Sequence, residues 1–136
     1  MKKNTELLLV GLSLLLYVLS LSFNALGCHS FGVDSGYKVE SGINLLLMGW
    51  MGVAIYNFGW LANINYLITL ISIVRKSNKV FFLACLNVTL ALSSLTLFLN
   101  KSEHVALYSG YYLWVASFLV LVIYGSIRSK YSKNTR

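Results

Sequence analysis

Residue types that could carry out chemistry are few in this chain. Cys28 stands beside His29, and Glu103 stands beside His104, so two imidazoles, a thiol and a carboxylate could hold a transition metal if both segments met. Their spacing matches no metal motif, and solvated loop histidines explain the same residues. The sequence also lacks a GxSxG nucleophile elbow, an HExxH zinc motif and a P-loop. We therefore expect a protein without catalytic residues, metal or cofactor.

The composition of the chain indicates whether it lies in water or in a membrane. Hydrophobic residues make up 57% of the sequence and charged residues 11%, whereas soluble domains carry about 25% charged residues. The apolar residues come in blocks, not at every second position, which excludes a β-barrel pattern. A membrane-crossing helix needs about 20 apolar residues. We predict an all-α membrane protein, a four-helix transmembrane bundle built as one domain over residues 1–136.

The basic residues predict the orientation of these helices. Nine of the eleven Lys and Arg residues fall before the first apolar run, in the RKSNK segment or in the tail, and only Lys38 and Lys101 lie elsewhere. Because cytoplasmic segments keep positive charge, both termini are expected on the cytoplasmic side of the membrane. The net charge of +7 then suits anionic lipid headgroups on the cytoplasmic side, and no basic groove for nucleic acid is left.

The uncharged run at 41–74 is too long for one crossing and too short for two. Because the chain starts inside and is inside again at Arg75, this run must supply one net crossing. Gly49, Gly52 and Gly59 permit a break in the helix. We predict a short interfacial or re-entrant helix at about 43–55, and one long tilted helix is the alternative. The predicted spans are about 7–26, 58–74, 80–100 and 108–127.

The start of the chain has a second interpretation. MKKNTE, followed by an apolar run that ends at Cys28, is similar to a secretory or lipoprotein signal. The run of about 20 uncharged residues exceeds the 7 to 15 of a signal peptide, and only Gly27 matches a lipobox. We therefore expect a first transmembrane helix, and lipidation of Cys28 stays open.

Small polar side chains recur along the predicted spans and could act inside the membrane. Many stand at offsets of 0, 4, 7 and 11, which share one helix face. No acidic or basic residue accompanies them in the first three runs, although proton-coupled carriers usually depend on one. We expect seams that hold the bundle together, and a small channel or carrier is the alternative. This polar seam comprises Ser13, Tyr17, Ser20, Asn24, Asn65, Thr69, Ser72, Asn87, Thr89, Ser93 and Thr96.

Aromatic residues gather on the outer side of the predicted topology. An aromatic belt at the membrane interface accounts for them, yet aromatic side chains are also common anchors of protein interfaces. We predict a non-catalytic protein that binds or scaffolds a membrane or periplasmic partner, as an accessory subunit or an immunity or exclusion protein does. The outer aromatic residues are Trp50, Tyr56, Phe58, Trp60, Tyr111, Tyr112 and Trp114.

Three short stretches carry a resemblance. GWMG, NFGWLAN and GYYLWVAS, within residues 49–64 and 110–117, resemble a pattern of small uncharacterised bacterial inner-membrane proteins with four spans. That pattern often has proline after the WLAN asparagine, where this chain has Ile64. The resemblance implies the four-span topology and a place in the inner membrane of a bacterium, with both termini in the cytoplasm, and it carries no activity.

Overall fold

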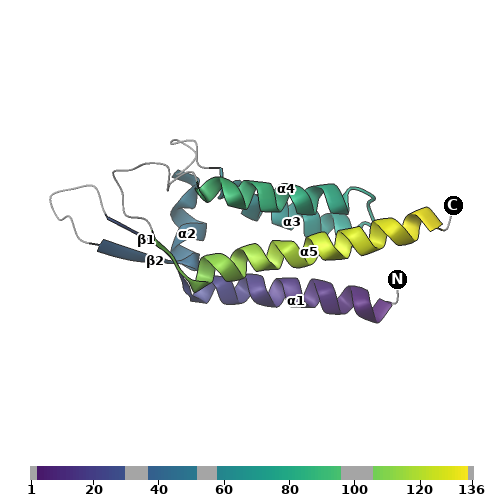
Figure 1. Ribbon diagram of the computed structural model, residues 1–136, viewed down its shortest axis with the longest axis horizontal. Helices are drawn as coiled ribbons and strands as arrows, with labels where there is room; N and C mark the ends of the chain where they lie inside the picture. The colour runs from purple at the N-terminus through teal and green to yellow at the C-terminus, as the bar shows by residue number, and fades with distance from the viewer. Residues whose placement is uncertain (1–2, 30–36, 52–57, 96–105, 135–136) are drawn as a thin grey trace.

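Figure 1 shows a computed structural model of the chain, which describes residues 3–29, 37–51, 58–95 and 106–134. These residues form five helices, namely α1 (Lys3–Ser22), α2 (Gly42–Met48), α3 (Leu61–Val74), α4 (Val80–Leu92) and α5 (Ser109–Asn134). They also form three strands, namely β1 (Asn24–His29), β2 (Tyr37–Ser41) and β3 (Ala106–Leu107). The predicted mainly helical architecture is confirmed, and the strands are an addition to it.

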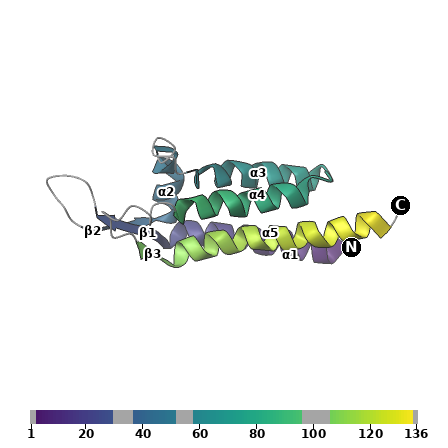
Figure 2. The ribbon, with the colours of Figure 1, turned by 45° about the horizontal axis from the view of Figure 1, so that its top comes forward.

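Four helices run side by side along the long axis of the molecule (Figure 1, Figure 2). α1 packs along α5, α5 along α4, and α4 along α3. Both chain termini and the turn between α3 and α4 lie at one end of this bundle, which we call the termini end. The strands lie at the opposite end, the sheet end, where α2 crosses the bundle (Figure 1).

The lengths of the helices differ between the two pairs. Asn4–Ser22 and Ser109–Tyr131 are long and apolar enough to cross a membrane. α3 has 14 residues and α4 has 13, so at about 1.5 Å per residue they extend about 20 Å each. The predicted span 7–26 is displaced, since α1 covers Lys3–Ser22, and within the predicted span 80–100 the helix α4 ends at Leu92. α1 ends at Ser22 because the chain turns into β1, and α4 gives way to a turn at 93–95, after which 96–105 lie outside the described residues.

A three-stranded antiparallel sheet, in the order β2-β1-β3, corrects the all-α prediction. β1 pairs with β2, and Leu26 of β1 also stands opposite Leu107 of β3. Asn24, predicted to extend the seam of the first helix, lies in β1 opposite Ser41. Strand formation depends on such distant pairing more than on local propensity, which is why the sequence pattern did not indicate these strands.

The long run at 41–74 is broken, as the glycines indicated. α2 covers Gly42–Met48 and a 3₁₀ turn follows at 49–51, so it is shorter than the predicted 43–55, of which 52–55 fall outside the described residues. The indole Nε1 of Trp60 donates to Leu46 O at 2.7 Å. In one continuous helix these residues would stand about 21 Å apart along the axis. The alternative of a single long tilted helix is therefore wrong.

The interior of the bundle combines small residues with aromatic rings. Ala62, Ala84 and Ala91 are fully buried in the hydrophobic core, together with Phe118 and Leu121. Their small side chains let α3 and α4 approach their neighbours closely. The core therefore lies along the axis that joins the termini end to the sheet end.

Candidate functional site

A first group of buried polar side chains joins α3 to α4. Asn65 Nδ2 donates to Asn87 Oδ1 at 2.6 Å and to Leu83 O at 2.9 Å. Asn87 Nδ2 donates to Thr69 Oγ1 at 3.1 Å, and Thr69 Oγ1 donates to Asn65 O at 2.8 Å. Asn87 and Thr69 are fully buried. Three of these four bonds form a closed ring through Asn65, Asn87 and Thr69, so this group ties the two shorter helices together.

A second group joins α1, α3 and α5. Ser13 Oγ donates to Ser117 O at 2.8 Å, so the Tyr66 hydroxyl, 3.0 Å from Ser13 Oγ, is the donor of that second bond. The ring of Tyr66 stacks on Tyr17 with centroids 4.5 Å apart, and it also contacts Phe118. Within the described residues, no buried side-chain nitrogen or oxygen lacks a hydrogen-bond partner. These seam atoms therefore connect helices and leave no row of free polar groups.

The other members of the polar seam differ in burial and in hydrogen bonding. Ser20 is buried and donates to Tyr17 O at 2.6 Å within α1. Thr89 is exposed and donates to Cys85 O at 3.2 Å within α4. Neither bond joins two helices. Ser72 and Ser93 are half-buried, and Thr96 lies outside the described residues.

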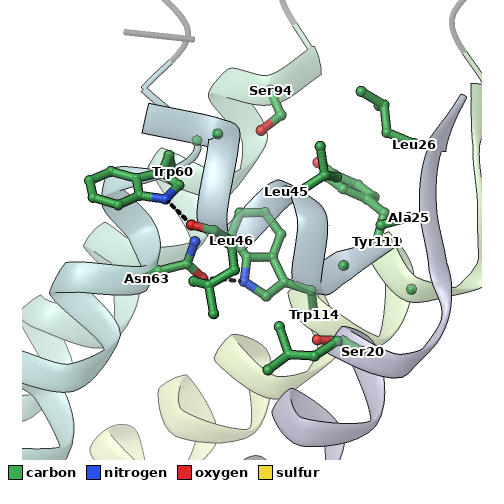
Figure 3. Close-up of a pocket in the computed structure, with 15 residues that line it drawn as sticks. Ser20, Ala25, Leu26, Leu45, Leu46, Trp60, Asn63, Ser94, Tyr111 and Trp114 are labelled. Carbon is green, nitrogen blue, oxygen red and sulfur yellow. Dashed lines mark hydrogen bonds between the residues drawn. The ribbon is translucent and has the colours of Figure 1, made fainter. Parts of the chain in front are cut away.

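A cavity of about 230 Å³ opens at the sheet end, where α1, α2, α3 and α5 meet β1 and the end of α4 (Figure 3). Leucine side chains from α1 and α2 and the rings of Trp60 and Trp114 form much of its wall. The Trp60 indole is fixed by its bond to Leu46 O, which ties α3 to α2. No charged residue is among the described residues that line this cavity.

Asn63 is the polar residue that sequence reasoning missed. Its Oδ1 accepts hydrogen bonds from the Tyr17 hydroxyl at 3.0 Å and from Trp114 Nε1 at 2.9 Å. An indole N–H can only donate, so the amide atom facing Trp114 must be the oxygen. Asn63 lines the cavity, on the side where Leu46 and Trp60 lie (Figure 3), and no hydrogen bond from its Nδ2 is found among the described residues. The available signal was an amide inside an apolar run, two positions before Asn65 and so off the face of the seam.

The outer aromatic residues divide into two sets. Trp50 is 56% exposed, Phe58 39% and Tyr112 61%. Tyr111 is buried and its hydroxyl donates to Ala91 O at 3.2 Å, while the half-buried Trp60 and Trp114 line the cavity. Tyr56 lies outside the described residues. The structure thus presents three of the seven aromatic residues to the surroundings and turns three inward.

The residues that the sequence offered as metal ligands lie largely outside the part of the chain that the structure describes. Glu103 and His104 are not described, nor are the side chains of Cys28 and His29. Among the described residues, no three His, Cys, Asp or Glu side chains are grouped as a metal ion would require.

Comparisons with known proteins add no relative. No family model, no curated protein and no solved structure matches the chain. The motif resemblance therefore stays a prediction, and function has to be argued from the polar clusters, the cavity and the exposed aromatic residues.

Proposed function

We propose that this chain is a multi-pass protein of the bacterial inner membrane, with α1, α3, α4 and α5 as four crossings. Large apolar side chains on the outside of the bundle support the proposal, among them Leu7 at 77% exposure, Val74 at 81% and Phe82 at 68%. A surface this apolar is costly in water and suits lipid. The bonds of Ser13 to two other helices support α1 as a member of the bundle in preference to a removable signal.

The two shorter helices fit this topology through α2. α3 and α4 extend about 20 Å each, and the hydrocarbon core is about 30 Å thick. α2 crosses their sheet-end termini (Figure 1), and a helix with its side chains is about 10 Å in diameter. The short pair and the crossing helix together therefore match the length of α1.

The termini end faces the cytoplasm in this proposal. Arg75, Lys76 and Lys79 lie in or beside the turn between α3 and α4, and Arg128 and Lys130 lie near the end of α5. Figure 1 places both segments at the same end. Their positive charge supports a cytoplasmic position beside anionic headgroups.

Single-cysteine labelling tests the orientation. Ser77→Cys and Lys38→Cys are made in a chain whose Cys28 and Cys85 are replaced by serine, and intact cells are treated with a membrane-impermeant maleimide. We expect labelling of Lys38→Cys alone, with Ser77→Cys labelled only after the cells are opened. Labelling of Ser77→Cys in intact cells would contradict the topology.

Within this topology the chain is a non-catalytic protein that binds or scaffolds a membrane or periplasmic protein at its sheet end. The observation that carries this proposal is the exposure of Trp50, Phe58 and Tyr112 at that end. Exposed aromatic side chains are common anchors of interfaces. The alternative of a channel or carrier has less support, because the seam atoms bond to one another. An accessory subunit or an immunity or exclusion protein needs only such a surface.

A pull-down in mild detergent from the native host tests partner binding. The tagged chain is compared with Trp50→Ala and Tyr112→Ala, which remove exposed rings, and with Phe82→Ala, which removes an exposed ring near the termini end. We expect a stoichiometric membrane or periplasmic partner that both sheet-end variants lose and Phe82→Ala keeps. Recovery of the chain alone, or equal loss in all three variants, would overturn the proposal.

A further inference from the structure

The cavity at the sheet end has a feature that packing alone does not explain. Asn63 lines it, and no hydrogen bond from Asn63 Nδ2 is found among the described residues, although Oδ1 of the same amide accepts two bonds. Since no buried side-chain nitrogen of the described residues lacks a partner, Nδ2 keeps some exposure to the cavity. A ligand that brings an acceptor oxygen would complete the hydrogen bonds of this amide.

We propose that this cavity binds the uncharged, carbonyl-bearing part of an amphiphile, whose carbonyl oxygen accepts a hydrogen bond from Asn63 Nδ2. The site is independent of the partner surface formed by Trp50, Phe58 and Tyr112, since none of these three lines the cavity. The following features of the cavity define the chemistry of its ligand.

The walls select against charge. Leu21, Leu45 and Leu46 line the cavity together with the rings of Trp60 and Trp114, and no charged residue is among its described lining. An ion moved into such surroundings has no counter-charge and loses its hydration. The part of the ligand inside the cavity is therefore neutral, with an apolar body against the leucines and rings.

The hydrogen-bond donors on the cavity wall indicate which polar group the ligand carries. Asn63 supplies an amide N–H, and the hydroxyl of Ser94 at the end of α4 also lies on the cavity wall (Figure 3). Ligand sites are commonly apolar with a few placed polar groups that fix orientation. An ester or ketone oxygen matches an amide donor, whereas a ligand with donors alone would leave Nδ2 unpaired.

The cavity is held open before any ligand binds. A β-carbon on Gly42 would collide with Ser20 O, and one on Gly110 would lie 2.7 Å from Asn24 O, so backbone packing fixes both walls. The Trp114 indole is fixed by its bond to Asn63. The volume of about 230 Å³ exceeds the roughly 150 Å³ of an engineered cavity that binds benzene. A ring or a folded part of an acyl chain therefore fits without rearrangement.

Two sources offer this chemistry in a membrane. The ester carbonyl and acyl chain of a phospholipid are one, and a free lipid-soluble ketone such as a benzoquinone with an alkyl tail is the other. Both present a carbonyl beside an apolar body, so the probes below separate them.

Tryptophan fluorescence can report binding directly. The chain has three tryptophans, and Trp50→Phe leaves only Trp60 and Trp114, which line the cavity. The full chain with this change is titrated in detergent with a decyl-substituted benzoquinone or with phosphatidylglycerol brominated on its acyl chains. We expect saturable quenching by one of the probes, and the probe that saturates identifies the source.

Two further variants, made in the same background, tie the quenching to the cavity. Asn63→Asp at pH 8 keeps an oxygen for Tyr17 and Trp114 but replaces the free donor, and we expect about tenfold weaker binding, as for one lost hydrogen bond. Ser94→Phe fills the cavity from its wall and should weaken binding by a similar factor or more. Ser129→Phe, at an exposed site near the other end of α5, should bind as the parent does.

The outcomes separate a ligand site from a void. Saturable quenching that Asn63→Asp and Ser94→Phe weaken and Ser129→Phe preserves would support the site. Quenching that rises linearly with both probes, or that is equal in Ser94→Phe and Ser129→Phe, would overturn it. All variants are first checked for a single gel-filtration peak and an unchanged helical circular dichroism spectrum, so that misfolding is not read as lost binding.

Discussion

In the middle of the bundle, the amide nitrogens of Asn65 and Asn87 both donate to partners on neighbouring turns or helices. At the sheet end, Asn63 accepts two bonds on its oxygen and leaves its nitrogen facing a cavity. The same residue type thus closes one region and leaves the other open. Pairing in a membrane interior stabilises helix contacts, whereas an unpaired donor marks a position where another molecule can bind.

A substitution at the tightest helix contact of the bundle should reduce the free energy of unfolding most. A β-carbon on Gly125 of α5 would lie 2.7 Å from the backbone of Phe81, so Gly125→Val must separate α5 from α4. We expect a loss of about 3 kcal/mol in the free energy of unfolding, at the upper end of overpacking costs. Titration with a denaturing detergent, followed by circular dichroism, measures it.

Gly11→Val is the matched control, because a β-carbon there has no atom within 4 Å. It carries the same change of helix propensity without the clash. An equal loss in both variants would show that the close approach of α4 and α5 contributes nothing.

Asn87→Leu should produce the second largest effect. It removes an acceptor from Asn65 and a donor to Thr69, so we expect a loss of about 1 to 3 kcal/mol. Thr89→Leu, at an exposed position whose hydroxyl bonds only within its own helix, is the control. The same detergent titration compares them.

The Asn87→Leu variant also discriminates between a bundle and a conduit. In liposomes, the parent chain and the variant should show the same background ion leakage, because the seam atoms bond to one another. Flux through the parent that Asn87→Leu abolishes would favour the channel or carrier, and the closed region would need another interpretation.

The sequence predicted the hydrogen-bonded middle of the bundle better than the sheet end with its cavity. The 0, 4, 7, 11 spacing identified Ser13, Asn65 and Thr69 because a helix face repeats with that period, and the structure buries all three. In α4 the spacing selected Thr89 and Ser93, which are exposed and half-buried, whereas the buried Asn87 lies on the adjacent face. It missed Asn63, whose role depends on Trp114, a residue far away in the chain that donates to it.

The sheet end resisted prediction for a related reason. β1 pairs with β3 across most of the sequence, and no local period signals such a contact. The aromatic residues gave the same difficulty, since Tyr111 and Tyr112 are neighbours in the chain but one is buried and the other is 61% exposed. Composition placed both at the outer end and could not assign their directions.

Ser13→Ala tests the link between α1 and the rest of the closed region. It removes the acceptor of the Tyr66 hydroxyl and the donor to Ser117 O, so we expect a loss of about 1 kcal/mol in unfolding free energy. Ser72→Ala, at a half-buried seam position, should cost less. A Ser13→Ala variant as stable as Ser72→Ala would mean that α1 is held by apolar packing alone.

The smallest effect on stability is expected at the surface of the open region. Trp50 is 56% exposed, so Trp50→Ala should change the unfolding free energy by less than about 0.5 kcal/mol. Trp60→Ala should cost more, because it removes a cavity wall and the bond that joins α3 to α2. The difference between the two variants, measured in one detergent titration, separates an aromatic ring that builds the sheet end from one that is free to meet a partner. Equal losses would place Trp50 in the structure and leave Phe58 and Tyr112 as the exposed rings of that surface.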